Sequence, residues 1–141
     1  MAKPEFFVTP GYGELMRDSF HFSQAVRIGD RIELAGQTGC NDQLEIPPSV
    51  EDEIRQAFAN VERTLQQAGA TWANVYRLVT YHVVDSGDPA IAEPVLEYCV
   101  SLLREHVPGH APIWTAVGVP RLALPGMRIE IVVSATVDHG S

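Results

Sequence analysis

The stretch HFSQAVRIGDRIELAGQ, residues 21–37, contains the pattern that decides the fold. Polar and apolar residues alternate over residues 31–35, and another run of strand-forming residues comes before Gly29 and Asp30. A two-residue connection with glycine first is typical of a type II′ turn between antiparallel strands. The stretch therefore predicts a β-hairpin.

Downstream of the hairpin the sequence predicts a long amphipathic helix. Ser49 is a suitable N-cap, and Asp52 follows three residues later among other acidic residues. Gly69 is well placed to end the helix. Apolar residues recur between these limits at helical spacing, namely Ile54, Phe58, Val61 and Leu65.

The second half of the chain predicts another strand and another helix. Residues 75–85 are rich in β-branched and aromatic side chains, which is typical of a buried strand. Asp88 and Pro89 suit the N-cap and the first position of a second helix. Pro94 is tolerated because it lies in the opening turns of that helix.

Two strands, 114–119 and 127–137, are predicted to close the chain. In the last strand alternate residues share a face. One face carries Ile129, Ile131, Val133, Ala135 and Val137, and the other carries Arg128, Glu130, Ser134 and Thr136.

The order of elements, β-β-α-β-α-β-β, predicts an α+β fold in which a mixed sheet has both helices on one face. No layer remains in the sequence to cover the other face, so burial against further subunits is the natural expectation. The chain is predicted to be one domain over residues 1–141. Its irregular parts are expected at residues 1–18, 40–49 and 107–112.

Composition excludes several classes of function. The net charge is −8 and only ten Lys and Arg are present, which argues against nucleic acid as a partner. No apolar run approaches a membrane span and no secretory signal is evident, so we expect a cytoplasmic protein. Cys40 and Cys99 lack metal-ligand spacing and are expected to be small buried residues rather than reactive thiols. No motif indicates a metal or a cofactor.

Several short segments resemble, in order and in spacing, the Rid/YjgF family of reactive intermediate deaminases, also known as L-PSP endoribonucleases. FSQAV at residues 22–26 and AGQ at 35–37 are similar to that family's opening "YSQAV" and "SGQ". AGA at 68–70 resembles the end of its first helix, and TYHVVD at 80–85 its "TVYLTD" strand. RIEI at 128–131 resembles its "VEIE".

This resemblance implies a chorismate-mutase-like α+β fold and a homotrimer with three clefts between subunits. Its implied activity is the hydrolysis of enamines and imines to ketones and ammonia. A trimer would also bury the sheet face that the sequence leaves uncovered. The ligand expected in the clefts is a small molecule.

The chain departs from the family at the residue that binds the substrate carboxylate. Active deaminases carry a motif "PARS/T", whose Arg holds a carboxylate in bidentate fashion. Pro112, Ile113, Trp114 and Thr115 occupy the corresponding place, so Trp114 stands where the Arg is expected. One interpretation is an aromatic-lined cleft, and the other is that Trp114 packs at the trimer interface.

Glu130 is the one residue that we predict to be catalytic, because it matches the family's water-ordering Glu. A carboxyl group between apolar walls has a raised pKa and can donate as well as accept a proton. The alternative is an outward Glu paired with Arg128 or Arg17.

The remaining candidate binding residues are Phe22, Gly36, Gln37, Thr115 and His110. Phe22 replaces a family Tyr, and Glu93 stands where an Asn is usual. Gly36 and Gly39 bracket Gln37, which indicates a close approach of the backbone. His82 is expected to be a satisfied core or interface residue.

Two functions remain open from the sequence. The first is a hydrolase or deaminase-type enzyme acting on a small imine, enamine or unsaturated acid, distinct from the standard 2-aminoacrylate deaminase. The second is a non-catalytic trimer that binds a small molecule. Ribonuclease activity is disfavoured by the acidic charge.

Overall fold

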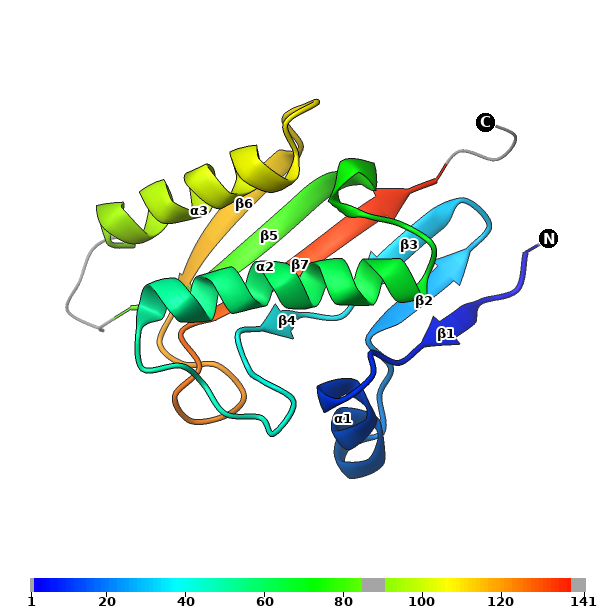
Figure 1. Ribbon diagram of the computed structural model, residues 1–141, viewed down its shortest axis with the longest axis horizontal. Coiled ribbons are helices and arrows are strands. Elements are labelled where there is room, and N and C mark those ends of the chain that lie inside the picture. The colour runs from blue at the N-terminus through cyan, green and yellow to red at the C-terminus, as the bar shows by residue number, and fades with distance from the viewer. Residues whose placement is uncertain (1, 85–90, 138–141) are drawn as a thin grey trace.

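The computed structural model describes residues 2–84 and 91–137, which form one mixed sheet with helices (Figure 1). The strands lie in the order β1-β2-β3-β7-β5-β6, and β4 pairs separately with β7. β5 and β6 are parallel, whereas the other pairs are antiparallel. The strands are β1 (Glu5–Phe7), β2 (Ala25–Ile28), β3 (Arg31–Leu34), β4 (Gln37–Thr38), β5 (Val75–Val83), β6 (Ile113–Val119) and β7 (Ile129–Thr136).

The predicted hairpin is confirmed as β2 and β3. Ile28 pairs with Arg31 across the two-residue turn. Gly29 has a φ of 60°, a left-handed conformation that glycine adopts without steric cost. The turn thus fixes the register that directs Ile32 and Leu34 to the core.

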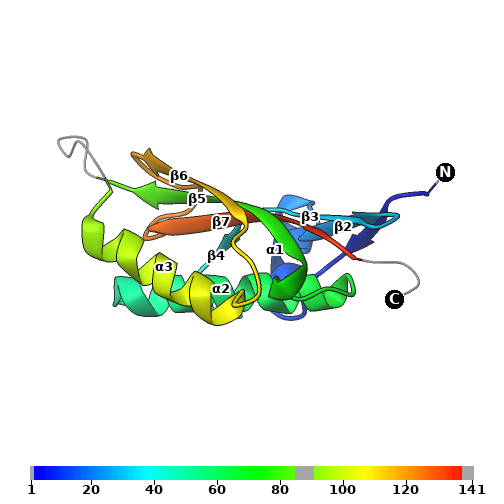
Figure 2. The same cartoon turned by 90° about the horizontal axis from the view of Figure 1, so that it is seen from above.

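Two helices cover one face of the sheet, as the order of elements predicts. Figure 2 shows α2 (Val50–Gln67) and α3 (Glu93–His106) lying on the same side of the strands. The predicted apolar face of β7 is buried against them. The core between helices and sheet includes Ile54, Phe58, Val61, Leu65, Trp72, Ile129, Ile131 and Val133.

The limits predicted for the first of these helices are confirmed. The Ser49 side chain accepts a hydrogen bond from the Asp52 amide at 3.3 Å, and Gly69 follows the helix with a φ of 90°. The start predicted for the second helix is wrong, because Ile91 and Ala92 are not helical and α3 begins at Glu93. Asp88 and Pro89 lie outside the described residues. Pro94 does lie in the first turn, where its missing N–H costs nothing.

The expectation of an irregular segment over residues 1–18 is wrong. β1 extends the hairpin by pairing with β2, and a helix, α1 (Tyr12–Phe20), follows it. The 3-10 turn η1 (Trp72–Asn74) was also not expected. β1 and η1 have three residues each, which is too few for a periodic pattern to show in the sequence.

The second face of the sheet lies away from helices α2 and α3 (Figure 2). Cross-strand pairing places apolar and polar residues together there: Phe6, Val26, Glu33, Ser134, Val132, Glu130, Val79, Tyr81, Thr115 and Val117. This arrangement is the α+β architecture that the sequence predicts, with three helices rather than two.

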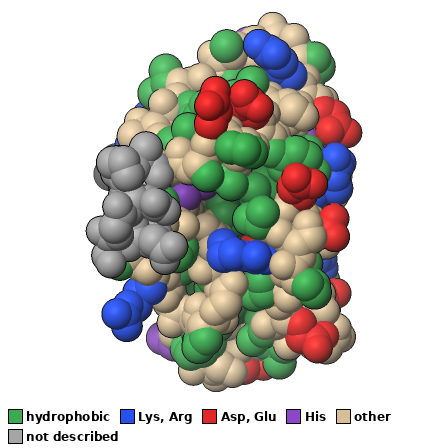
Figure 3. All heavy atoms as spheres, turned by 90° about the vertical axis from the view of Figure 1, so that its left-hand side faces the viewer, with side chains coloured by type: hydrophobic (Ala, Val, Ile, Leu, Met, Phe, Trp, Pro, Cys, Tyr) green, Lys and Arg blue, Asp and Glu red, His purple; other side chains and the backbone are tan. Residues whose placement is uncertain are grey.

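At the end of the molecule where the β6–β7 loop lies, acidic and basic side chains surround a hydrophobic area (Figure 3). The basic residues do not gather into one patch on this face. In the described part of the chain, no helix is long and apolar enough to cross a membrane.

Candidate functional site

A cavity of about 310 Å³ lies beside Glu130, between α1 and the loop that joins β6 to β7. Helix α1 lines one side with Tyr12, Met16 and Phe20, which share a helix face because they are four residues apart. The loop lines the other side with Ala123, Leu124 and Met127. The rest of the lining comes from Phe22, Gln24, Gly36, Gln37, Thr38 and Glu130.

Glu130 is the acidic residue of this cavity. Burial raises the pKa of its carboxyl group above the ordinary value of 4.5. The carboxylate accepts no hydrogen bond from any described residue, so no donor offsets the loss of solvent. Tyr81 lies directly opposite it in the β5–β7 ladder. A carboxyl group in this setting can hold a proton and exchange it with a ligand.

Gly36 and Gly39 both allow the close approach that their sequence pattern indicates. A Cβ atom on Gly36 would overlap the carboxyl end of Glu130, at 2.7 Å from its Cγ atom. A Cβ atom on Gly39 would lie 2.6 Å from Cγ of Glu53. The chain around β4 therefore needs glycine to pass beside these two acidic side chains.

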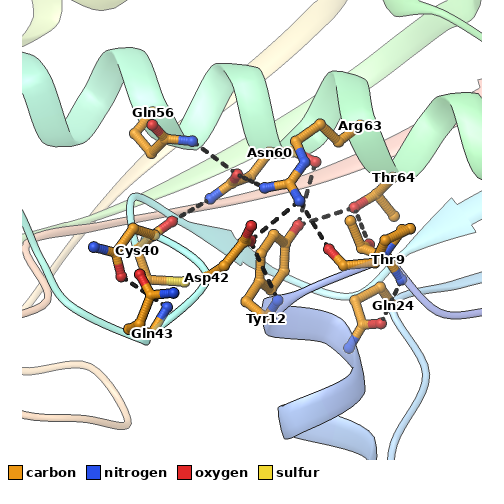
Figure 4. Close-up of polar contacts among 12 residues, drawn as sticks. Thr9, Tyr12, Gln24, Cys40, Asp42, Gln43, Gln56, Asn60, Arg63 and Thr64 are labelled. Atoms are coloured by element: carbon orange, nitrogen blue, oxygen red, sulfur yellow. Dashed lines mark hydrogen bonds and ion pairs between the residues drawn. The ribbon is translucent and has the colours of Figure 1, made fainter.

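A buried polar network attaches α1 to the body of the protein (Figure 4). The Tyr12 hydroxyl donates to Oε1 of Gln37, which also accepts from Thr64 at 3.2 Å. Thr64 and Thr9 join hydroxyl groups at 2.7 Å, and the Thr9 amide donates to Gln24 at 2.9 Å. These bonds satisfy the polar groups that line the inner side of the cavity.

A second set of contacts joins helix α2 to the residues just before α1 and to the loop after β4 (Figure 4). Nη2 of Arg63 donates to the carbonyl of Pro10 at 2.8 Å and to Asp42 at 3.1 Å. Its guanidinium lies over the Tyr12 ring at 5.2 Å. The side-chain amide of Asn60 donates to the carbonyls of Thr38 and Cys40. Helix α2 thereby positions both α1 and the loop after β4.

Trp114 does not line this cavity within one subunit. It pairs with Leu78, which is buried beneath the helices, whereas Glu130 pairs with Tyr81 on the opposite sheet face. The indole of Trp114 packs against the core and donates to Oγ1 of Thr80 at 2.9 Å. Thr115 shares the sheet face of Glu130 but lies two strands away, on the edge strand β6.

The histidines singled out in the sequence also lie away from Glu130. Nε2 of His110 contacts the carbonyl of Val75 at 2.7 Å, at the far end of β5 from Tyr81. His82 is buried under the helices, where its Nε2 bonds to Thr80 at 2.7 Å. Its Nδ1 atom has no partner among the described residues, and burial lowers its pKa.

Arg128 is not the partner of Glu130. Its Nε atom binds Oε1 of Glu53 at 2.6 Å and its backbone amide donates to Oε2 of the same residue at 2.7 Å. The guanidinium also donates to the carbonyls of Pro47 and Pro48. Arg17 pairs instead with Asp18. Both partners that the alternative interpretation assigned to Glu130 are thus engaged elsewhere.

The structure brings together four of the predicted site residues: Glu130, Phe22, Gly36 and Gln37. It places Trp114, Thr115 and His110 outside the cavity of the same subunit. The predicted irregular segment over residues 1–18 leaves out Tyr12, Met16 and Phe20, although their four-residue spacing is a helical signal. Leu124 and Met127 come from a loop and leave no periodic pattern.

The two cysteines are buried, as the sequence predicts. Burial raises the pKa of both thiols, that of Cys99 to about 12. Thiols of this kind are poor nucleophiles at neutral pH. Among residues 2–84 and 91–137, no group of three or more His, Cys, Asp or Glu is placed to hold a metal ion.

The sequence is similar to those of known proteins. The chain is 33% identical over 120 residues to the RutC family protein YjgH of Escherichia coli K12, covering 84% of each chain. It is 28% identical over 112 residues to a 2-iminobutanoate/2-iminopropanoate deaminase of Dermatophagoides farinae, covering 78% of this chain and 80% of that one.

Solved structures agree with the fold. Rv2704 of Mycobacterium tuberculosis, a member of the YjgF/YER057c/UK114 family, superimposes with a TM-score of 0.74 at 25% identity, covering 96% of this chain and all of that one. E. coli TdcF with bound serine gives a TM-score of 0.70 at 25% identity, covering 83% and 88%. The model of the family described as Endoribonuclease L-PSP matches residues 16–137. The chain therefore belongs to the endoribonuclease L-PSP family, the Rid/YjgF family that its sequence motifs resemble.

Proposed function

We propose that this protein is an acid–base enzyme of the Rid family that acts on a small imine, enamine or unsaturated acid, with Glu130 as its catalytic group. The observation that carries the proposal is the position of Glu130 on the wall of a mostly apolar cavity, where burial raises its pKa. A raised pKa leaves more of the carboxyl group protonated near neutral pH. The same group can then donate and accept a proton in turn.

Hydrolysis of an imine uses both states of such a carboxyl group. The acid gives its proton to the imine nitrogen, and the resulting carboxylate takes a proton from water as the water oxygen bonds to the imine carbon. The carboxyl group next protonates the amine nitrogen of the carbinolamine, the C–N bond breaks to release ammonia, and the carboxylate takes the hydroxyl proton as the carbonyl forms. The carboxyl group ends as it began, and one water is consumed for each ammonia released.

Two relatives support a nitrogen-containing substrate. One is named as a 2-iminobutanoate/2-iminopropanoate deaminase, and the TdcF structure holds serine, a small amino acid. The proposed substrate differs from these in being more apolar. No Lys, Arg or His belongs to the described lining of the cavity, and Trp114 is predicted to replace the family's carboxylate-binding Arg.

The cleft is proposed to be completed by a second subunit of a homotrimer. Helices α2 and α3 lie on the face of the sheet opposite the one that carries Glu130 (Figure 2). Ile113, at the start of edge strand β6, is 66% exposed, and a large apolar side chain this open favours burial in an assembly. In the proposed trimer, Thr115 reaches the cleft from the neighbouring subunit, whereas Trp114 packs against the core of its own subunit.

Replacement of Glu130 by Gln tests this function. Imines are generated in place from a series of amino acids by an amino-acid oxidase, and the decay of each imine is followed with and without the protein. We expect the wild type to accelerate hydrolysis of its preferred imine and Glu130→Gln to remove that acceleration. Glu97→Gln, an exposed carboxylate on α3, is the matched control and keeps full activity.

Two results would contradict the proposal. Full activity in Glu130→Gln would remove this residue from the mechanism. A wild-type protein that binds small ligands but accelerates none of the imines would favour the alternative, a trimer that binds a metabolite without turning it over.

A further inference from the structure

The apolar part of the cavity beside Glu130 is formed by elements outside the motifs on which the proposed function rests. Three of the twelve lining residues of the cavity belong to α1, which begins at Tyr12, and the family match begins at residue 16. The facing wall is the loop that carries Leu124 and Met127.

Most polar groups of the lining already have partners inside the protein. Oε1 of Gln37 accepts from Tyr12 and Thr64, and its Nε2 atom donates to the carbonyl of Ala35 at 3.0 Å. Oε1 of Gln24 accepts from the Thr9 amide. Gln37 and Gln24 thus have their carbonyl oxygens engaged. This leaves the carboxyl group of Glu130 as the ionisable group that a ligand can engage.

Two aromatic side chains of this cavity are unusually open. Phe20, at the end of α1, is 53% exposed, and Phe22 is 40% exposed. Exposed aromatic side chains that cluster at a cavity are typical of a binding surface, because their burial by a ligand removes apolar area from water. With Met16, Leu124 and Met127 they offer a ligand an apolar environment on two sides.

The size and charge of the cavity restrict its occupant. A cavity of roughly 150 Å³ is enough to hold a benzene molecule, and this one measures about 310 Å³. Since its described lining contains no cationic side chain, an anionic group inside it would be desolvated without a partner. The apolar part of the cavity therefore disfavours an anionic group and has room for a group with the bulk of a phenyl ring.

We infer that α1 and the β6–β7 loop form a subsite for the side chain of the substrate, and that this side chain is aromatic or a branched hydrocarbon. This inference rests on the proposed function in one respect, namely that the reacting end of the substrate lies at Glu130. The substrate is thus an imine or enamine with a large apolar group, whose carboxylate, where it has one, stays outside the cavity. Met16, Phe20, Leu124 and Met127 determine this specificity.

Direct binding tests the subsite without reference to turnover. Affinities of the full chain for phenylpyruvate and for 2-oxobutanoate are measured by calorimetry, because these oxo acids are the products of a bulky and a small imino acid. We expect phenylpyruvate to bind roughly tenfold or more tightly, since each buried methylene is worth roughly fourfold. Equal affinities would overturn the inference.

Variants of α1 test whether the preference for phenylpyruvate arises in this cavity. Met16→Glu places a charge in the cavity and removes the preference for phenylpyruvate, whereas Leu15→Glu, on an exposed part of the same helix, retains it. Should Met16→Glu fail to fold, Phe20→Ala against Leu15→Ala makes the same comparison with no charge introduced. Equal effects of the cavity and control variants in either pair would overturn the inference.

The same measurements separate this inference from the proposed function. Glu130→Gln is expected to lose turnover while it keeps the preference for phenylpyruvate, because the apolar walls are intact. If Glu130→Gln keeps turnover, the acid–base role is wrong, and the binding preference of the wild type still decides the subsite.

Discussion

Gly36 lies against the carboxyl end of Glu130, so closely that a methyl group on Gly36 would overlap it. The backbone of Gly36 thereby forms the surface against which the Glu130 side chain rests. Its φ is not in the left-handed region, so alanine is conformationally allowed there. Replacing Gly36 by alanine therefore tests the steric contact with Glu130 rather than backbone strain.

Gly36→Ala is expected to push the Glu130 carboxyl group away from its place in the cavity. Overpacking of this kind costs about 1–3 kcal/mol of stability. Turnover should fall well beyond the loss of folded protein, because a catalytic group displaced by about 1 Å can cost roughly a hundredfold in rate. Gly109→Ala is the matched control, since a Cβ atom at Gly109 meets no described atom within 4 Å. Similar activities of the two variants would contradict the assigned contact.

The raised pKa of Glu130 makes stability depend on pH in a defined direction. Below the ordinary value of 4.5 the carboxyl group is protonated in folded and unfolded protein alike, so burial carries no penalty. As pH rises, the unfolded chain ionises first, and the folded state loses stability relative to it. Glu130→Gln cannot ionise and escapes this loss.

Thermal unfolding at pH 4 and at pH 7.5 measures this effect. The Tm of Glu130→Gln minus that of the wild type is expected to increase between the two values of pH. A constant difference would show that folding leaves the pKa of Glu130 unchanged, and a difference that decreases with pH would show that the folded protein stabilises the carboxylate form. Either result would contradict the prediction.

The ion pair between Arg128 and Glu53 is expected to matter far more than a surface pair. Glu53 is fully buried and receives two hydrogen bonds from Arg128, one of them from the backbone. Arg128→Ala leaves a buried carboxylate with one of these donors, which costs about 3 kcal/mol.

Arg55→Ala is the control, because Arg55 meets Glu105 at 3.9 Å with both side chains more than half exposed. Exposed pairs contribute about 0–1 kcal/mol. Denaturant unfolding of the two variants should give clearly different losses of stability. Equal losses would mean that Glu53 finds another partner when Arg128 is removed.

The fold was largely predictable because its long elements carry strong local signals. The turn at Gly29, the cap at Ser49 and the alternation in β7 each specify structure through nearby residues. The cavity was predictable only in part. Glu130 and Gly36 lie in recognisable segments, whereas α1 depends on Tyr12 contacting α2 across the molecule, a contact with no local sequence signal.

Position 114 shows a different limit of sequence reasoning. Its motif suggested a cleft residue, and pairing with Leu78 places it on the sheet face away from Glu130. Sequence position fixes the strand and the side-chain parity, but it does not say which subunit completes a site. In the proposed trimer it is Thr115, and not Trp114, that shares the sheet face of Glu130.

The wild-type protein is expected to hydrolyse 2-iminobutanoate poorly. The family's Arg would hold the carboxylate of this substrate through two charge-assisted hydrogen bonds, each worth about 1.5–3 kcal/mol. Trp114 supplies neither bond, because its single N–H is donated to Thr80. Loss of both bonds corresponds to a decrease of at least about a hundredfold in kcat/KM. The imine of phenylalanine, generated by the same oxidase, is the internal comparison, since its ring can fill the cavity between α1 and the β6–β7 loop. Hydrolysis of 2-iminobutanoate as fast as that of the phenylalanine imine would contradict this prediction. It would show that the protein binds the carboxylate without the Arg of the family motif.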